Sequence, residues 1–225
     1  MPSYKKHALF SIIIALPFIP DVFYLSLALI GASIVDMDHH VKKKNLILMS
    51  LLGIILSILL YILNLPFLFG IALIFMALIF YISKHRGFSH SIFGTLLSSF
   101  LLAFFVIGFY SLVNGFGIEN KLSLILISII LGIITLNKKI LLPFIILVTL
   151  GVILTSNQSI NPYLTFFGIF LGYLSHLILD LFTPSGIKIL NPLSSKKFNK
   201  CMGIVLFILW GLGAFIFNFK YIILS

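Results

Sequence analysis

Apolar runs alternate with short polar connections along almost the whole sequence. With 61% hydrophobic and 9% charged residues, the chain cannot cover a water-soluble globule with polar side chains. A segment inside a lipid bilayer must satisfy its own backbone hydrogen bonds, so each apolar run is expected to form a helix. We therefore predict an all-α fold, a polytopic bundle of transmembrane helices that forms one integral membrane domain over residues 1–225.

The polar connections divide the chain into about seven full spans or near-spans, preceded by a short N-terminal hairpin. In the hairpin, helices over 7–16 and 22–35 flank a turn at 17–21, and each is shorter than the roughly 17 to 25 residues of a full span. The sequence leaves open whether 122–154 forms two spans or one bent helix. The later helices are expected over 46–63, 66–82, 92–113, 122–136, 140–154, 162–182 and 202–219.

The basic residues indicate how the chain is oriented. The net charge of +10 comes from lysines spread over short connections, which argues against nucleic acid as a partner. If each helix crosses in turn, the N-terminus and the connections at 36–45, 83–91, 137–139 and 183–200 share one face. That face holds every lysine and arginine except Lys121 and Lys220. By the positive-inside rule we expect this face to be cytoplasmic, in a multi-pass protein of the inner, cytoplasmic membrane.

Histidines and carboxylates gather in three polar motifs on this face. They include every histidine except His7 and every acidic residue except Asp21 and Glu119. Such concentration is difficult to explain by solvation alone. The motifs are Asp36-Met37-Asp38-His39-His40, then His85-Arg86-Gly87-Phe88-Ser89-His90-Ser91, and finally His176 with Asp180.

The third motif lies near the end of an apolar run. His176 and Asp180 are four residues apart, so a helix places both side chains on one face, with Thr183 a further turn on. An ionisable group in the middle of a membrane helix costs roughly 2.5 to 3.5 kcal/mol on insertion scales, and such groups are usually functional. This imidazole and carboxylate can share one metal ion or one proton.

Aspartate and histidine side chains from separate helices are a common way to bind a divalent metal in a bundle. Such an ion, with zinc or manganese as our guesses, lowers the pKa of a bound water and polarises a carbonyl or phosphoryl oxygen. Cys201 is the only cysteine, which excludes a cysteine-based zinc site. The sequence offers more candidate ligands than one ion needs. Either two ions bind, or some of these residues only hold the true ligands in position. The candidate ligands are Asp36, Asp38, His85, His90, His176 and Asp180.

Several of these residues also have an ordinary structural interpretation. Carboxylates commonly follow the end of a helix, and His40 with the three lysines after it fits a solvated flank. Ser89 or Ser91 could simply cap the helix that begins near residue 92. His7 is either a further contributor to the site or an interfacial residue, and the role of His39 stays open.

Arg86 is the only arginine of the chain. Its planar guanidinium suits a phosphate or a carboxylate, so its partner is either a substrate or one of Asp36 and Asp38. We expect Arg86, His90 and Asp180 to take part in the hydrolysis of an ester or phosphoester by an activated water. Because the site lies at headgroup depth, a membrane lipid or lipid-linked phosphate is the expected substrate.

Together the three motifs resemble those of the YdjM-like family of integral inner-membrane proteins, of the LexA-regulated type. The family pattern has Pro-Asp-x-Asp-His, His-Arg-x-x-x-His-Ser and a later His-x-x-x-Asp-x-x-Thr-x-x-Gly with a downstream proline. Here Val35 replaces the first proline, while Thr183, Gly186 and Pro192 match the later positions. The family is described as predicted membrane-bound metal-dependent hydrolases, so the resemblance implies a metal-dependent hydrolase. The family's early histidine could correspond to His7.

Two functions from other classes remain open. The same cluster could relay protons or pass a metal ion in a non-enzymatic transporter, which predicts polar residues continuing across the bilayer. It could also only fix helix packing in a structural scaffold. The sequence determines neither the metal, the substrate nor the oligomeric state.

Overall fold

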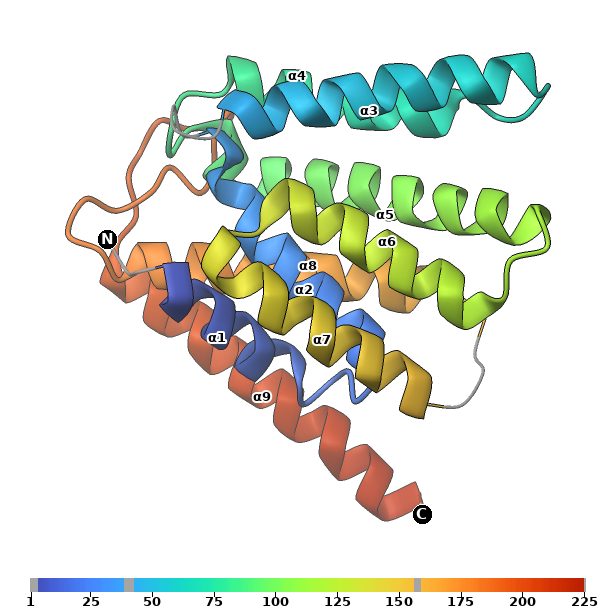
Figure 1. Cartoon of the computed structure of the whole chain (residues 1–225). Coiled ribbons are helices and arrows are strands. Elements are labelled where there is room, and N and C mark those ends of the chain that lie inside the picture. Colours follow the sequence, from blue (N-terminus) through green and yellow to red (C-terminus); the bar gives the residue numbers. More distant parts are fainter. Residues whose placement is uncertain (1–3, 39–42, 156–158, 225) are drawn as a thin grey trace.

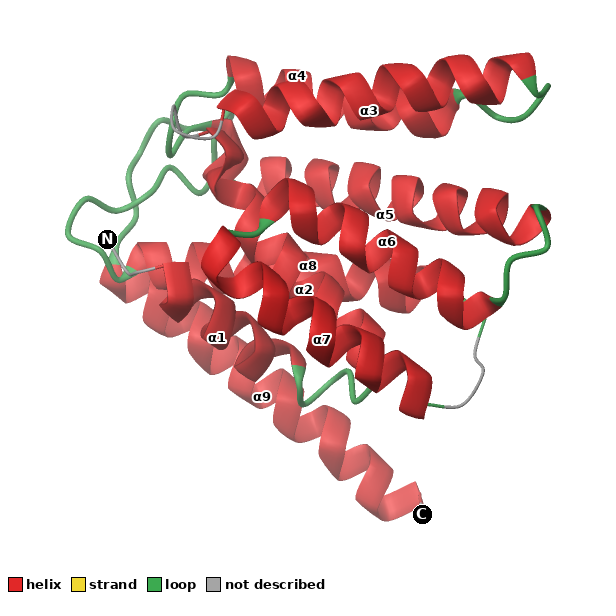
Figure 2. Ribbon diagram, in the orientation of Figure 1, coloured by secondary structure: helices red, strands yellow, loops and turns green. Residues whose placement is uncertain are grey.

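The computed structural model describes residues 4–38, 43–155 and 159–224. The described residues are mostly helical and include no strand (Figure 2). His39 and His40 of the first motif lie outside these ranges. The elements are α1 (Tyr4–Ala15), α2 (Val22–Ile34), the 3-10 turn η1 (Val35–Asp38), α3 (Lys43–Ile62), α4 (Leu68–Ile82), the 3-10 turn η3 (Phe88–His90), α5 (Ile92–Gly115), α6 (Asn120–Thr135), α7 (Lys138–Leu154), α8 (Pro162–Leu181) and α9 (Lys200–Leu224).

Each expected helix is present, and the differences lie at the ends. The carboxylate of Asp21 accepts a hydrogen bond from the backbone N–H of Phe23 at 2.8 Å, which caps α2 after the predicted turn. α4 begins at Leu68 rather than at residue 66, after a turn in which Asn64 adopts a positive φ of 54°. The segment 122–154 forms two separate helices, because Asn137 caps a new helix, α7.

The number of spans is confirmed only in part. Four of the described helices are long and apolar enough to cross a membrane: α3, α5, α8 and the Lys200–Phe219 part of α9. The expected seven spans are not confirmed, because α4 and α6 are apolar but have only 15 and 16 residues. Many large apolar side chains on the outer helices are exposed, as expected of a surface that faces lipid.

The helices are stacked in layers (Figure 1). The α3–α4 hairpin is one outer layer, α5 and α6 lie beneath it, and α2 and α8 pass through the middle, with α1, α7 and α9 on the far side. The 3-10 turn η1, the loop before α5 and the loop after α8 all lie at the end of the bundle that also holds the start of α1. The prediction that the three polar motifs share one end is therefore confirmed.

α2 and α8 pack with their backbones in direct contact. A Cβ on Gly172 of α8 would overlap the carbonyl oxygen of Ala28, and one on Gly31 of α2 would overlap that of Ile169. Gly168, one turn before Gly172, also faces α2. Small residues at such spacing let membrane helices approach closely. This contact sets where the end of α8 lies relative to the end of α2.

We expect Gly172→Ala to lower the free energy of unfolding by about 1–3 kcal/mol, because the added methyl group forces the helices apart. Gly211→Ala is the matched control, because a Cβ at this position on α9 meets nothing within 4 Å. Thermal unfolding of both variants in detergent, followed by circular dichroism, tests the difference. Equal stability of the two variants would show that the close contact is not required.

Candidate metal centre

The end of α8 supplies two of the site residues. His176 and Asp180 are both 1% exposed, and His176 Nε2 lies 3.6 Å from Asp180 Oδ2. His176 Nδ1 lies 2.7 Å from the backbone oxygen of Ala32 on α2. A carbonyl only accepts hydrogen bonds, so Nδ1 must carry a hydrogen. When the imidazole is neutral, the lone pair of Nε2 therefore points into the site.

The first motif continues directly from α2. A 3-10 turn follows the last helical residue, and it brings Asp36 to the end of α8. Asp36 Oδ1 lies 3.5 Å from His176 Nε2 and 3.9 Å from His90 Nε2. The Asp36 side chain is 27% exposed, so it lies on the rim of an otherwise buried group.

The second motif turns sharply before α5. Gly87 makes this turn possible, because a Cβ there would lie 2.6 Å from the backbone oxygen of Lys84. Ser91 caps α5 by accepting a hydrogen bond from Gly94 N at 3.0 Å, which settles which of the two serines is the cap. The turn directs His90 inward, where it is fully buried, with Nε2 3.4 Å from Asp180 Oδ2.

Nitrogen and oxygen atoms from three elements thus converge on one point. The measured separations between His90 Nε2 or His176 Nε2 and the two carboxylates run from 3.4 to 3.9 Å. Two ligands that each lie about 2.0–2.1 Å from a tetrahedral zinc ion are roughly 3.4 Å apart. Asp36, His90, His176 and Asp180 could therefore hold one divalent ion with little movement.

Hydrogen bonding supports the same interpretation. Within the described part of the chain, both Nε2 atoms and both carboxylate oxygens of Asp180 are buried without a hydrogen-bond partner. Buried polar atoms are nearly always paired, because an unpaired one loses its interactions with water. These atoms belong to the residues that could hold an ion, so the donor set fits a divalent metal.

Asp38 lies behind His90 rather than at the point of convergence. Its Oδ2 is 3.3 Å from His90 Nδ1 and accepts a hydrogen bond from Ser89 Oγ at 2.5 Å. Its Oδ1 is 2.9 Å from His85 Nδ1. Burial alone raises the pKa of Asp38, but the hydrogen bonds and the attraction to His90 outweigh it and lower the pKa below its ordinary value. An ionised carboxylate here fixes the orientation of the His90 ring.

The possible ligands among the described residues therefore form three overlapping groups. Ligand atoms lie within 4.8 Å of one another in each of the sets Asp38, His85 and His90; Asp36, His90 and His176; and His7, His176 and Asp180. His90 belongs to the first two groups, and its Nδ1 faces Asp38 while its Nε2 faces Asp36. The geometry is therefore compatible with both alternatives that the sequence left open, namely two ions or one ion with supporting residues.

His7 lies within the candidate site, although its place in the sequence was only a slight reason to consider it. It is 5% exposed, its ring stacks on that of His176 at 3.9 Å, and its Nε2 lies 3.7 Å from Asp180 Oδ1. The buried position disfavours the alternative in which His7 is an interfacial residue. The early histidine of the resembling family was the one signal for it.

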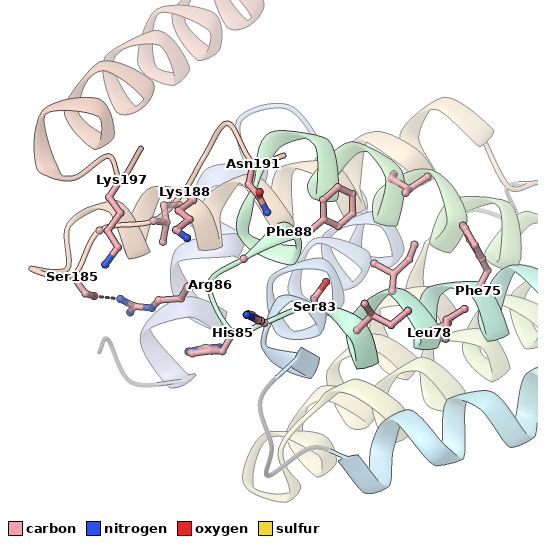
Figure 3. Close-up of a pocket in the computed structure, with 17 residues that line it drawn as sticks. Phe75, Leu78, Ser83, His85, Arg86, Phe88, Ser185, Lys188, Asn191 and Lys197 are labelled. Atoms are coloured by element: carbon pink, nitrogen blue, oxygen red, sulfur yellow. Dashed lines mark hydrogen bonds between the residues drawn. The ribbon is translucent and has the colours of Figure 1, made fainter. Parts of the chain in front are cut away.

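Arg86 lies beside the site, close to Asp180. Its Nη2 lies 3.8 Å from Asp180 Oδ1, a partner that the sequence analysis did not name, and its Nη1 donates to Ser185 Oγ (Figure 3). Arg86 has a positive φ of 59°, a conformation that costs of order 1–3 kcal/mol and concentrates at functional sites.

We expect Asp38→Asn to weaken binding of zinc or manganese by about 10- to 100-fold without abolishing it, because the His90 ring loses its charged partner. Titration of the purified protein with each ion measures the change. Glu119→Gln is the control, since Glu119 lies before α6, far from the site in the chain, and its side chain makes no capping bond. Equal affinities in the two variants would exclude the supporting role of Asp38.

The comparison with known proteins agrees with the motifs. The model of the family described as YdjM inner membrane protein matches residues 1–224. No curated protein and no solved structure matches the chain. Since the family match extends over nearly the whole sequence, the resemblance first seen in three short motifs is confirmed. The chain belongs to the YdjM inner membrane protein family.

Proposed function

We propose that this protein is a membrane-bound, metal-dependent hydrolase that cleaves a phosphoester or ester. The observation that carries the proposal is the convergence of His90 Nε2, His176 Nε2 and the Asp36 and Asp180 carboxylates at 3.4 to 3.9 Å. The structure also fixes each imidazole through its other nitrogen, on Ala32 O or on Asp38. Such outer contacts are typical of histidines that bind metals.

Asp36, His90, His176 and Asp180 would hold the divalent ion. An ion in this position supplies a Lewis acid for the oxygen of the substrate and lowers the pKa of a water molecule. Zinc and manganese both suit imidazole and carboxylate ligands. The Asp38–His85 pair supports this set, or shares a second ion with His90.

The chain's own residues bind the substrate and handle the proton. Arg86 presents a guanidinium beside Asp180, where it orients an anionic oxygen of the substrate and stabilises charge that develops during cleavage. In this proposal the Asp180 carboxylate receives a proton from the attacking water, and His7, whose Nε2 lies 3.7 Å from Asp180 Oδ1, accepts it in turn. The burial of both ligand histidines keeps bulk water away from these groups.

We also propose that the site faces the cytoplasm. The bundle end that holds it carries lysines at the starts of α1, α3, α7 and α9, and further lysines in the loop after α8. The positive-inside rule places such an end on the cytoplasmic side of the inner membrane. A substrate would then reach the site from the inner leaflet or the cytoplasm.

A proton or metal-ion relay is the second candidate. Thr95, Ser98 and Ser99 of α5 and Tyr173 of α8 are buried, and their hydroxyl oxygens lack a hydrogen-bond partner in the described structure. Hydroxyl groups of this kind could extend a polar path from the site into the bundle. Transport without hydrolysis in reconstituted vesicles would favour this function.

We expect purified wild-type protein to contain a stoichiometric transition metal, and His176→Ala and Asp180→Asn to lose it, because each removes a ligand. Elemental analysis of the detergent-purified proteins measures the content. Glu119→Gln is the control for the loss of a carboxylate. Equal trace metal in all the proteins under metal-replete conditions would remove the basis of the hydrolase proposal.

We expect Arg86→Lys to lower kcat for phosphoester hydrolysis by about 10²–10³-fold while metal content stays unchanged, because lysine keeps the charge but loses the two-pronged guanidinium. Phosphate release from a panel of phosphomonoesters, measured beside elemental analysis, separates catalysis from metal binding. Full activity in this variant would contradict a role for Arg86 in the reaction.

A further inference from the structure

A cavity of about 820 Å³ opens beside Arg86, between the end of α4, the turn before α5 and the loop after α8 (Figure 3). This volume is in the range of sites that enclose small-molecule ligands. The residues that line the cavity form two groups, one basic and one apolar. In Figure 3 the basic side chains lie toward one end and the apolar ones toward the other.

The polar end is cationic. Lys84, Arg86, Lys188 and Lys197 line it, and none of the described lining residues is acidic. Arg86 Nε is buried and has no hydrogen-bond partner within the described residues. The loop that carries Lys188 and Lys197 is held in place by paired backbone bonds between Ile187 and Phe198, at 2.8 and 3.0 Å. A fixed group of cations with free donors suits a phosphate.

The other end is apolar and is formed by exposed side chains of two helices. Phe75 and Leu78 of α4 and Leu97 of α5 line it, and these side chains are 37 to 48% exposed. α4 and α5 are apolar helices, and most of their other exposed side chains are also large and hydrophobic. A hydrocarbon chain can therefore enter this end sideways from the membrane, without crossing water.

We propose that this cavity binds a lipid that ends in a phosphate group, with the phosphate at the lysine cluster and the chain against Phe75 and Leu78. The inference rests on the proposed function and names its substrate class. Arg86 lines the cavity and also lies 3.8 Å from Asp180, so a phosphate bound to it lies next to the candidate metal ligands.

The reaction follows from this placement. Water adds its oxygen to phosphorus, the bond between phosphorus and the lipid oxygen breaks, and the lipid oxygen takes up a proton. The products are a lipid alcohol, which stays in the membrane, and inorganic phosphate, which leaves to the aqueous side. The apolar end of the cavity selects lipid phosphates over soluble ones.

Binding of dioctanoyl phosphatidic acid to the full-length, chelator-treated protein in detergent tests the proposal without turnover. We expect the double variant Lys188→Gln/Lys197→Gln to bind about 30-fold more weakly, because losing the attraction of each lysine weakens binding roughly fivefold. Lys138→Gln/Lys139→Gln is the matched control, because it removes the same charge at the same bundle end and outside the cavity. Equal weakening in both double variants would overturn the site.

A second comparison tests the lipid chain. We expect Phe75→Ala to weaken binding of the phosphatidic acid several-fold and to leave binding of inorganic phosphate unchanged, while Phe215→Ala, on exposed α9, changes neither. Dioctanoylglycerol, which lacks the phosphate, should bind poorly. Inorganic phosphate that binds as tightly as the lipid, or dioctanoylglycerol that binds equally well, would overturn a site for lipid phosphates.

The two proposals fail in different ways. Lipid binding that depends on Lys188 and Lys197 in a protein without stoichiometric metal would contradict the hydrolase and support the lipid site. Stoichiometric metal with phosphomonoester hydrolysis, but lipid binding indifferent to these lysines, would contradict the lipid site alone.

Discussion

The backbone contact between α2 and α8 is the constraint on which the candidate site depends. Lipid is as apolar as the helix surfaces, so close packing and hydrogen bonds between helices, rather than the hydrophobic effect, hold such helices together. Gly31 and Gly172 permit the contact, and His176 strengthens it by donating to Ala32 O at 2.7 Å. The same hydrogen bond orients the imidazole of His176. The contact between the two helices therefore also determines the geometry of the site.

Burial determines how the rest of the site is organised. Three carboxylates and four imidazoles gathered at the end of a membrane bundle are expensive unless something balances the charge and occupies the lone pairs. Part of that balance is visible, because His85, Ser89 and His90 surround the Asp38 carboxylate. Asp180 has no such set of donors in the described structure, and Arg86 and His7 approach it only to 3.8 and 3.7 Å. A divalent cation would complete the balance at Asp180.

Arg86 connects the two proposals. It occupies a strained backbone conformation with a positive φ, between the candidate metal ligands and a cavity that opens toward lipid. Strain of this kind persists only where the surrounding structure enforces it. Here the close turn at Gly87 and the hydrogen bond to Ser185 hold the side chain. A single guanidinium thus lies where a lipid headgroup and the hydrolytic groups would meet.

The sequence by itself determined the all-α fold, the order of the helices and the gathering of the motifs at one end, because apolar runs, caps and crossings are local features. It also placed His176 and Asp180 one turn apart. Tertiary structure alone decided that His7 enters the site, that Arg86 pairs with Asp180, and that Asp38 lies behind His90. These outcomes depend on helix packing and side-chain direction across long separations in sequence, which no local pattern encodes.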